Sequence, residues 1–211
     1  MTRWSRRRGA HAPAPPAHAA PGELYSPTMP ERARIFTRSE AVARALAGTP
    51  ALAGRVHRFG EVADLVLPPG GLFVARVPDE ARQPGPGDGF AAARARFGWL
   101  DDVWPSAAWL GRLRALATSA HPLAYYHYLE RGDHLYYAFG WLAGDGAELV
   151  VQQTSLVADD ECTAVFRETG STPLASASAW DAVLAHLGLA STIGFFRPED
   201  ELRESDWPPL D

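Results

Sequence analysis

The sequence predicts a single α+β domain in which an antiparallel sheet packs against about four helices. Short β-prone segments come in groups joined by tight turns that contain Gly and Pro, which is typical of antiparallel hairpins. The helical segments fall between two such groups of strands, or meanders, and do not alternate with single strands as a doubly wound fold requires. We therefore expect a sheet built from two meanders, with the globular domain at residues 31–197.

The composition fits this prediction and defines the broad class of protein. The chain has 211 residues, of which 46% are hydrophobic and 21% charged, so it is long enough for a real core. No apolar run approaches the roughly 18 residues that a membrane helix needs. Arg6–Arg8 is not followed by an apolar segment, which argues against a secretory signal. We expect a cytoplasmic protein.

The two ends of the chain differ from the body. Residues 1–30 include six prolines and are expected to form a disordered Arg/Ala/Pro-rich leader, so Met29 is an alternative start. Residues 198–211 form an acidic tail. Beyond residue 22 the chain has 16 arginines and 25 acidic residues, a net charge of −9 (16 − 25). Nucleic-acid binding is therefore the least favoured function, and Arg6–Arg8 would be its site.

Missing residue types exclude several chemistries. All 20 basic residues are arginine, and the chain has neither lysine nor asparagine, a pattern typical of a G+C-rich genome. Schiff-base chemistry, a P-loop lysine and a Cys-His-Asn triad are therefore excluded. Cys162 is the one cysteine, so the chain can form neither an internal disulfide nor a Cys-rich zinc site. No cofactor motif is present, and we expect no cofactor.

The first half of the domain is expected to begin with a helix and continue with short strands. Thr37 and Glu40 match a capping box, and Gly48 ends the apolar stripe that follows. Strands are then expected at Arg55–Phe59, Val62–Leu67 and Leu72–Val77, with Pro68–Gly71 as a turn.

Further helices and strands follow a Gly/Pro-rich loop at Arg82–Gly89. Asp88 is expected to cap a helix over Phe90–Phe97, and Ser106 a helix that places Trp109 and Leu113 on one face. Near the end of the domain, Ser178 and Asp181 form a capping pair for a helix that ends at Gly188. Strands are expected at Glu148–Val157 and Thr163–Arg167, and Thr192–Phe196 is expected to be a short apolar strand or a core plug.

The most informative segment is Leu123–Leu142, which predicts an aromatic hairpin. It contains five of the six tyrosines together with His127 and His134 around a turn at Gly132. Residues of these types favour paired strands. We expect one face of the hairpin to be core and the other to present tyrosines to solvent or to a ligand.

Two registers of this hairpin lead to different sites. A two-residue loop at Arg131–Gly132 pairs Leu129 with His134 and places both histidines on one face, near Glu130, as candidate metal ligands. A three-residue loop ending at a left-handed Gly132 pairs Tyr128 with His134 and separates the histidines.

The second register is favoured because it separates polar from apolar side chains more cleanly. It puts these residues on the core face: Tyr125, His127, Leu129, Leu135, Tyr137, Phe139 and Trp141. It puts these on the open face: Tyr126, Tyr128, His134 and Tyr136. A metal site is then disfavoured, and His127 is expected to be a core histidine.

Two other groups of residues are weaker candidates. Trp99, Trp104 and Trp109 beside Asp101 and Asp102 would suit a sugar or a cation, although such tryptophans more often anchor a loop to the core. Gln153 and Ser155 interrupt an apolar strand, which predicts either a sheet edge or the floor of a polar pocket.

Two functions are consistent with these observations. The favoured one is a binding protein, immunity-like or partner-neutralising, that uses Tyr126, Tyr128, His134 and Tyr136 as its contact surface. An acidic, aromatic surface would suit the basic site of a toxin. The alternative is a small metal-independent enzyme in which His134 acts as acid and base between sheet and helices. The partner would be a protein or a small molecule, and the sequence leaves the oligomeric state open.

Overall fold

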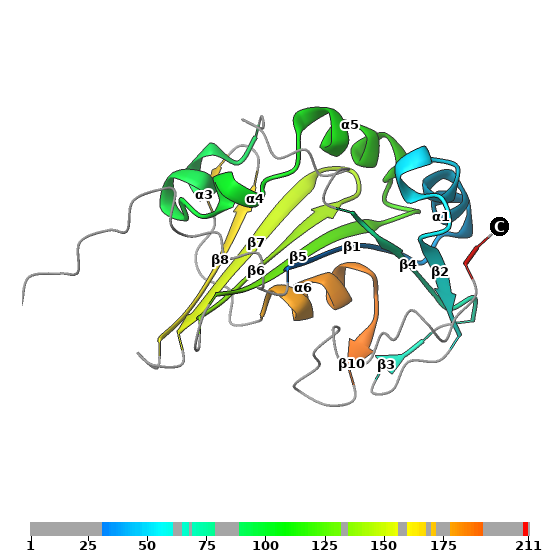
Figure 1. Ribbon diagram of the computed structural model, residues 1–211. Coiled ribbons are helices and arrows are strands. Elements are labelled where there is room, and N and C mark those ends of the chain that lie inside the picture. The colour runs from blue at the N-terminus through cyan, green and yellow to red at the C-terminus, as the bar shows by residue number, and fades with distance from the viewer. Residues whose placement is uncertain are drawn as a thin grey trace, which may run out of the picture.

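The protein has an α+β fold built on an antiparallel sheet, as the sequence predicts (Figure 1). The computed structural model describes residues 31–60, 65–67, 69–78, 89–131, 135–155, 160–167, 170–171, 178–191 and 209–210. Within these residues the main sheet has eight strands in the order β2-β4-β1-β5-β6-β7-β8-β9, and β10 pairs with β3 in a second, small sheet. The expected leader, the cap Asp88, the segment Thr192–Phe196 and most of the acidic tail lie outside the described residues.

The strands are β1 (Glu31–Thr37), β2 (Val56–Phe59), β3 (Leu65–Val66), β4 (Leu72–Arg76), β5 (Leu123–Arg131), β6 (Leu135–Ala143), β7 (Ala147–Ser155), β8 (Asp160–Arg167), β9 (Gly170–Ser171) and β10 (Ala190–Ser191). The helices are α1 (Glu40–Ala47), the 3-10 turn η1 (Pro50–Leu52), α3 (Ala91–Arg96), α4 (Leu100–Val103), α5 (Ala107–Leu116) and α6 (Ala179–His186).

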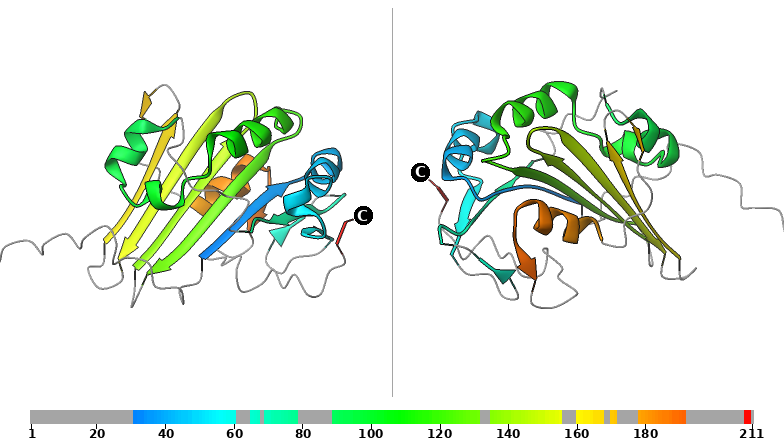
Figure 2. Two further views of the ribbon diagram at one scale, coloured as in Figure 1. Left: turned by 45° about the horizontal axis from the view of Figure 1, so that its top comes forward. Right: turned by 180° about the vertical axis from the view of Figure 1, so that it is seen from behind.

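The sheet separates two hydrophobic cores. One core lies between the sheet and helices α1, α3, α4 and α5, and the other lies between the sheet and α6 (Figure 2). Successive side chains along each strand point to opposite faces and pack into different cores. In β1, for example, Ile35 belongs to the first core and Phe36 to the second. The middle of the sheet is therefore covered on both faces.

Strand β1 is one of the elements that the sequence prediction missed. It lies between β4 and β5 in the sheet, with Thr37 at its end. The predicted capping role of Thr37 is wrong, because its hydroxyl donates to the Pro122 carbonyl instead (3.0 Å). Ser39 caps α1 by accepting a hydrogen bond from the Val42 N–H (3.3 Å), and Gly48 ends the helix as predicted.

The predicted first meander is wrong in its pairing. Strand β2 pairs directly with β4, and Leu65–Val66 leaves the main sheet to pair with β10. The turn that returns the chain to β4 depends on Gly71, whose φ is 80°. A Cβ at this position would overlap the Phe59 carbonyl oxygen, so the turn requires glycine.

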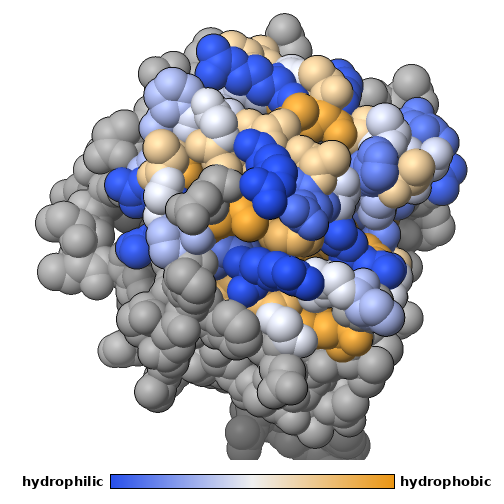
Figure 3. Space-filling model, turned by 90° about the vertical axis from the view of Figure 1, so that its right-hand side faces the viewer, coloured by the Kyte–Doolittle hydropathy of each residue, from blue (hydrophilic) through white to orange (hydrophobic). Residues whose placement is uncertain are grey.

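Strand β2 has a further neighbour on its outer edge. Pro209 forms an isolated bridge with His57, and the Leu210 N–H donates to the Val56 carbonyl (2.7 Å). Seen from this side of the molecule, hydrophilic and hydrophobic residues are interspersed (Figure 3). Proline has no N–H to offer a further strand, so this bridge partly protects the edge.

Helix α6 packs directly on β6 at a glycine. Ser178 and Asp181 form its capping box, as predicted, and the Ala179 N–H donates to the Gln152 side chain (3.0 Å). A Cβ on Gly140 would lie 3.0 Å from Val183 Cγ2 and 3.4 Å from the Ala179 carbonyl oxygen. The absence of a side chain at Gly140 therefore allows the helix to approach the sheet this closely.

This packing predicts the effect of filling the space at Gly140. We expect Gly140→Val to lower the free energy of unfolding by about 1–3 kcal/mol, because the new methyl groups would push α6 away from β6. Adding Val183→Ala should restore part of the loss. Urea denaturation followed by tryptophan fluorescence measures both effects.

Gly111 in α5 provides the matched control, since a Cβ there would have no neighbour within 4 Å. We expect Gly111→Ala to leave stability unchanged or raise it by up to about 1 kcal/mol. Equal losses in the Gly140 and Gly111 variants would show that α6 does not pack on Gly140.

Candidate binding surface on the aromatic hairpin

The register of the hairpin differs from both predicted registers but keeps the favoured division of faces. Leu129 pairs with Tyr137, and the last pair of the ladder is Arg131 with Leu135. Leu129 thus pairs four residues further along the chain than in the favoured register, with Tyr137 in place of Asp133. Because side chains alternate with a period of two, a shift by four residues leaves every described side chain on its predicted face. His134 lies outside the described residues.

His127 is a core histidine, as predicted. Its side chain is fully buried on the side of α3, α4 and α5, and its ring stacks on Phe139 with 5.2 Å between centroids and 4° between planes. Glu130 is an odd number of residues away on the same strand, so it lies on the opposite face. Among the described residues no cluster of three or more His, Cys, Asp or Glu side chains is arranged to hold a metal ion.

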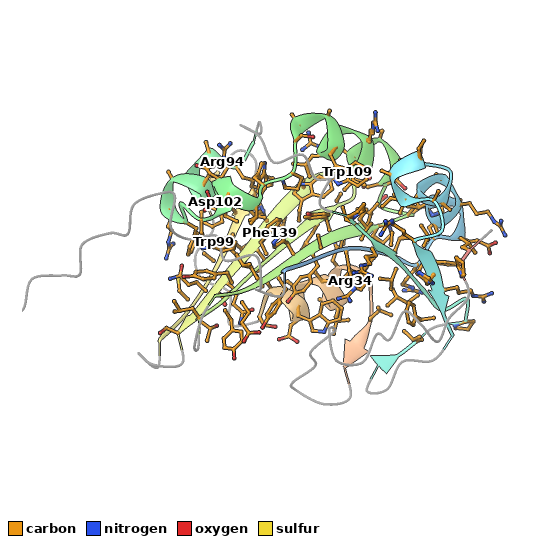
Figure 4. The ribbon with its side chains drawn as sticks, in the orientation of Figure 1. Arg34, Arg94, Trp99, Asp102, Trp109 and Phe139 are labelled. Carbon is orange, nitrogen blue, oxygen red and sulfur yellow. The ribbon has the colours of Figure 1, made fainter. Side chains whose placement is uncertain are left out.

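The tryptophans beside Asp101 and Asp102 anchor short helices to the sheet, which was the favoured alternative. Trp104 and Trp109 are buried in the core, and the half-buried Trp99 packs against Tyr137 with 5.1 Å between centroids (Figure 4). Asp101 is exposed and forms an ion pair with Arg94. These tryptophans therefore belong to the packing of α4 and α5, and the alternative of a sugar or cation site is not supported.

The expectation of an open second face is wrong at Tyr126. Its side chain is 5% exposed, and its ring makes an edge-to-face contact with Trp180 of α6, with 5.4 Å between centroids. Trp180 also contacts Phe36 of β1 in the same manner. Helix α6 thus covers the middle of this face, so Tyr126 is part of the second core.

Tyr128 and Tyr136 remain at the surface of the same face. Both are half-buried, and their rings lie 6.2 Å apart with 33° between planes. They lie toward the hairpin end, where β5, β6 and β7 extend past α6 (Figure 1). Tyr137 is also half-buried, but it lies on the opposite face with Trp99. The two tyrosines Tyr128 and Tyr136 form the candidate binding surface, which we call the tyrosine pair.

The polar residues of β7 divide between the two faces. Gln152 lies on the α6 side, where its side-chain oxygen accepts from Ala179, a role that the sequence did not reveal. Gln153 and Ser155 lie on the other side and are half-buried. Gln153 pairs with Cys162 of β8, whose sulfur lies 3.5 Å from Arg96 Nη2. These contacts place the predicted polar patch on the side of α3, away from the tyrosine pair.

Arg34 is a buried charged residue that the sequence prediction missed, because β1 was not predicted. It is 8% exposed and lies on the α6 side of the sheet (Figure 4). Its cross-strand neighbours are Arg76 of β4 and Tyr126 of β5. In the sequence, Ala33 and Ile35 alternate with Arg34 and Phe36, and this two-residue period could have indicated strand β1.

Comparison with known proteins gives no match: neither a protein-family model, nor a curated protein, nor a solved structure is similar to this chain. Each helix in the described part of the chain is too short or too polar to span a lipid bilayer. The function must therefore be inferred from the geometry of the chain itself.

Because Tyr126 is buried and Tyr136 is at the surface, we expect their substitution to lower the free energy of unfolding by different amounts. We expect Tyr126→Ala to lower the free energy of unfolding by about 3 kcal/mol or more, because it leaves a cavity under Trp180. Tyr136→Ala should cost less than about 1.5 kcal/mol, since its ring is already partly in water. Chemical denaturation of the two variants tests this. Equal costs would contradict the assignment of Tyr126 to the core and Tyr136 to the surface.

Proposed function

We propose that this chain is a non-catalytic binding protein of the partner-neutralising, immunity-like kind, and that its partner docks over Tyr128 and Tyr136. The observation that carries the proposal is the tyrosine pair itself, two half-buried aromatic rings packed against each other at the end of a long hairpin. Tyrosines are enriched in the energetically dominant parts of protein interfaces. Burying the remaining surface of these rings against a partner would contribute to affinity.

The scaffold around the pair supports the proposal, because it holds both rings in place before binding. Tyr128 is in β5 and Tyr136 in β6, and β6 is paired on both sides, by β5 and by β7. Tyr126, two residues from Tyr128 on the same face, is fixed beneath Trp180. A rigid aromatic surface loses little conformational entropy when a partner binds.

The enzyme alternative receives less support. It depends on His134, which lies outside the described residues. His127, the other imidazole of the hairpin, is fully buried on the opposite face and does not reach the surface that bears the tyrosine pair. General acid–base catalysis needs a group within hydrogen-bonding reach of the substrate. The binding function, in the cytoplasm, is therefore the function that we propose.

Site-specific photo-crosslinking tests the proposal. We expect p-benzoylphenylalanine in place of Tyr136 to crosslink one defined protein when the variant is irradiated in a lysate of the native cell. The same photo-reactive residue in place of Tyr137 is the matched control, since that position is half-buried in the same strand but faces the other side. Mass spectrometry identifies the products, and equal crosslinking at both positions would contradict the proposal.

The purified crosslinked protein then allows a measurement of affinity. We expect the double variant Tyr128→Ser/Tyr136→Ser to bind it at least about tenfold more weakly, because two central aromatic contacts are lost. Tyr137→Ser should bind as the unmodified protein does. An unchanged dissociation constant in the double variant, with an unchanged fold by circular dichroism, would rule out the tyrosine pair as the docking site.

A further inference from the structure

Glu130 lies beside the tyrosine pair on the same face of the sheet. It is two residues from Tyr128 on β5, and side chains two residues apart on a strand point to the same face. In the ladder it is directly opposite Tyr136 of β6, which places the two Cβ atoms about 5 Å apart. The pairing of β1 ends at Glu31, opposite Leu129, so no residue of β1 is opposite Glu130. We call Tyr128, Glu130 and Tyr136 together the hairpin patch.

Glu130 differs from the other carboxylates whose side chains the structure describes. The others have these partners: Glu40 pairs with Arg44, Asp101 with Arg94, Glu148 with Arg167, Asp145 with the Ser119 N–H and Asp181 with Ser178, and Asp102 also has a partner. Among the described residues, by contrast, none forms an ion pair or a hydrogen bond with the Glu130 carboxylate. Glu130 is also half-buried, so part of its hydration is already lost. Pairing this carboxylate with a cation is therefore favourable.

The two aromatic rings beside Glu130 complete a site for a cation. The faces of tyrosine rings attract cations, and the planar guanidinium group of arginine also stacks on them. A guanidinium group meets a carboxylate through two parallel hydrogen bonds, a geometry that the ammonium group of lysine lacks. The rings of Tyr128 and Tyr136 are 6.2 Å apart at their centroids, less than the roughly 7 Å that a planar group between them would need. The guanidinium is therefore expected beside the pair, next to Glu130.

We infer that the partner inserts an arginine at the hairpin patch, where its guanidinium pairs with Glu130 and packs on the tyrosine pair. This inference rests on the proposed function and specifies the chemistry of the partner, whose contact surface is basic. The charge of the chain supports it, since the part beyond residue 22 has 16 arginines and 25 acidic residues, a net charge of −9 (16 − 25). A field of this sign attracts a basic partner before contact and repels an acidic one, including nucleic acid.

Fluorescence anisotropy with defined peptides tests the inference on the full-length protein. The probes are fluorescein-labelled peptides of about ten residues in which glycine alternates with arginine, lysine or glutamate. We expect the arginine peptide to bind at least about threefold more tightly than the lysine peptide, and the glutamate peptide not to bind. The affinity for the arginine peptide should fall as NaCl rises from about 20 to about 200 mM.

Substitution of Glu130 separates the charge at the contact from the net charge. Glu130→Gln should weaken binding of the arginine peptide about fivefold or more, because it removes the negative charge and keeps the shape of the side chain. Glu40→Gln is the matched control. It removes the same charge from α1, on the other side of the sheet, and should bind the peptide as the unmodified protein does. Equal losses in the two variants, equal binding of the arginine and lysine peptides, or no saturable binding would each overturn the inference.

The stability of the same variant gives a second readout. Because no described residue pairs with the Glu130 carboxylate, we expect Glu130→Gln to leave the midpoint of urea denaturation unchanged or to raise it. A midpoint lowered as far as in Tyr126→Ala would show that the carboxylate holds the fold together, and would overturn its assignment to partner binding.

The failure of this inference is distinguishable from failure of the proposed function. If the protein crosslinked at position 136 binds through Tyr128 and Tyr136 but is insensitive to salt and to Glu130→Gln, the proposed function stands and the arginine contact is wrong. If no protein crosslinks at position 136, the proposed function fails first, and this inference fails with it.

Discussion

The packing of α6 on Gly140 is the constraint on which the packing of this whole face of the sheet depends. Helix α6 is held at both ends by the sheet, through Gln152 at its start and through His186, whose Nε2 lies 3.0 Å from the Ala143 carbonyl oxygen, at its end. Between these ends, Val183 lies against the bare backbone of Gly140. Because the helix lies this low, Trp180 reaches both Phe36 and Tyr126. The position of α6 therefore determines which side chains on this face are buried in the core and which remain at the surface.

The division of the hairpin follows from this arrangement. Tyr126, Tyr128 and Tyr136 share one face by strand alternation, yet only Tyr126 is beneath the helix. The other two stay half-buried and in contact with each other, which gives a rigid aromatic surface.

Local patterns in the sequence predict many of the helices and strands but few of the tertiary contacts between them. The capping box at Ser178 and the alternation of the hairpin are local, so the helix and the division of faces could be predicted. Strand β1 was not predicted, since arginines at positions 32 and 34 alternate with its apolar residues. The burial of Tyr126 depends on Trp180, which is 54 positions away in the sequence (180 − 126), and no local pattern predicts that contact. Of the tyrosines predicted for the open face, Tyr128 and Tyr136 are half-buried, whereas Tyr126 belongs to the core.

The most direct test is nitration of tyrosines by tetranitromethane in the native protein, alone and with the protein that crosslinks at position 136, mapped by mass spectrometry. In the free protein we expect modification at Tyr128, Tyr136 and Tyr137 and none at Tyr125 or Tyr126, which are buried. In the complex, Tyr128 and Tyr136 should become protected while Tyr137 continues to react. Nitration of Tyr126 as fast as Tyr136, or protection of Tyr137 in place of the tyrosine pair, would contradict the account.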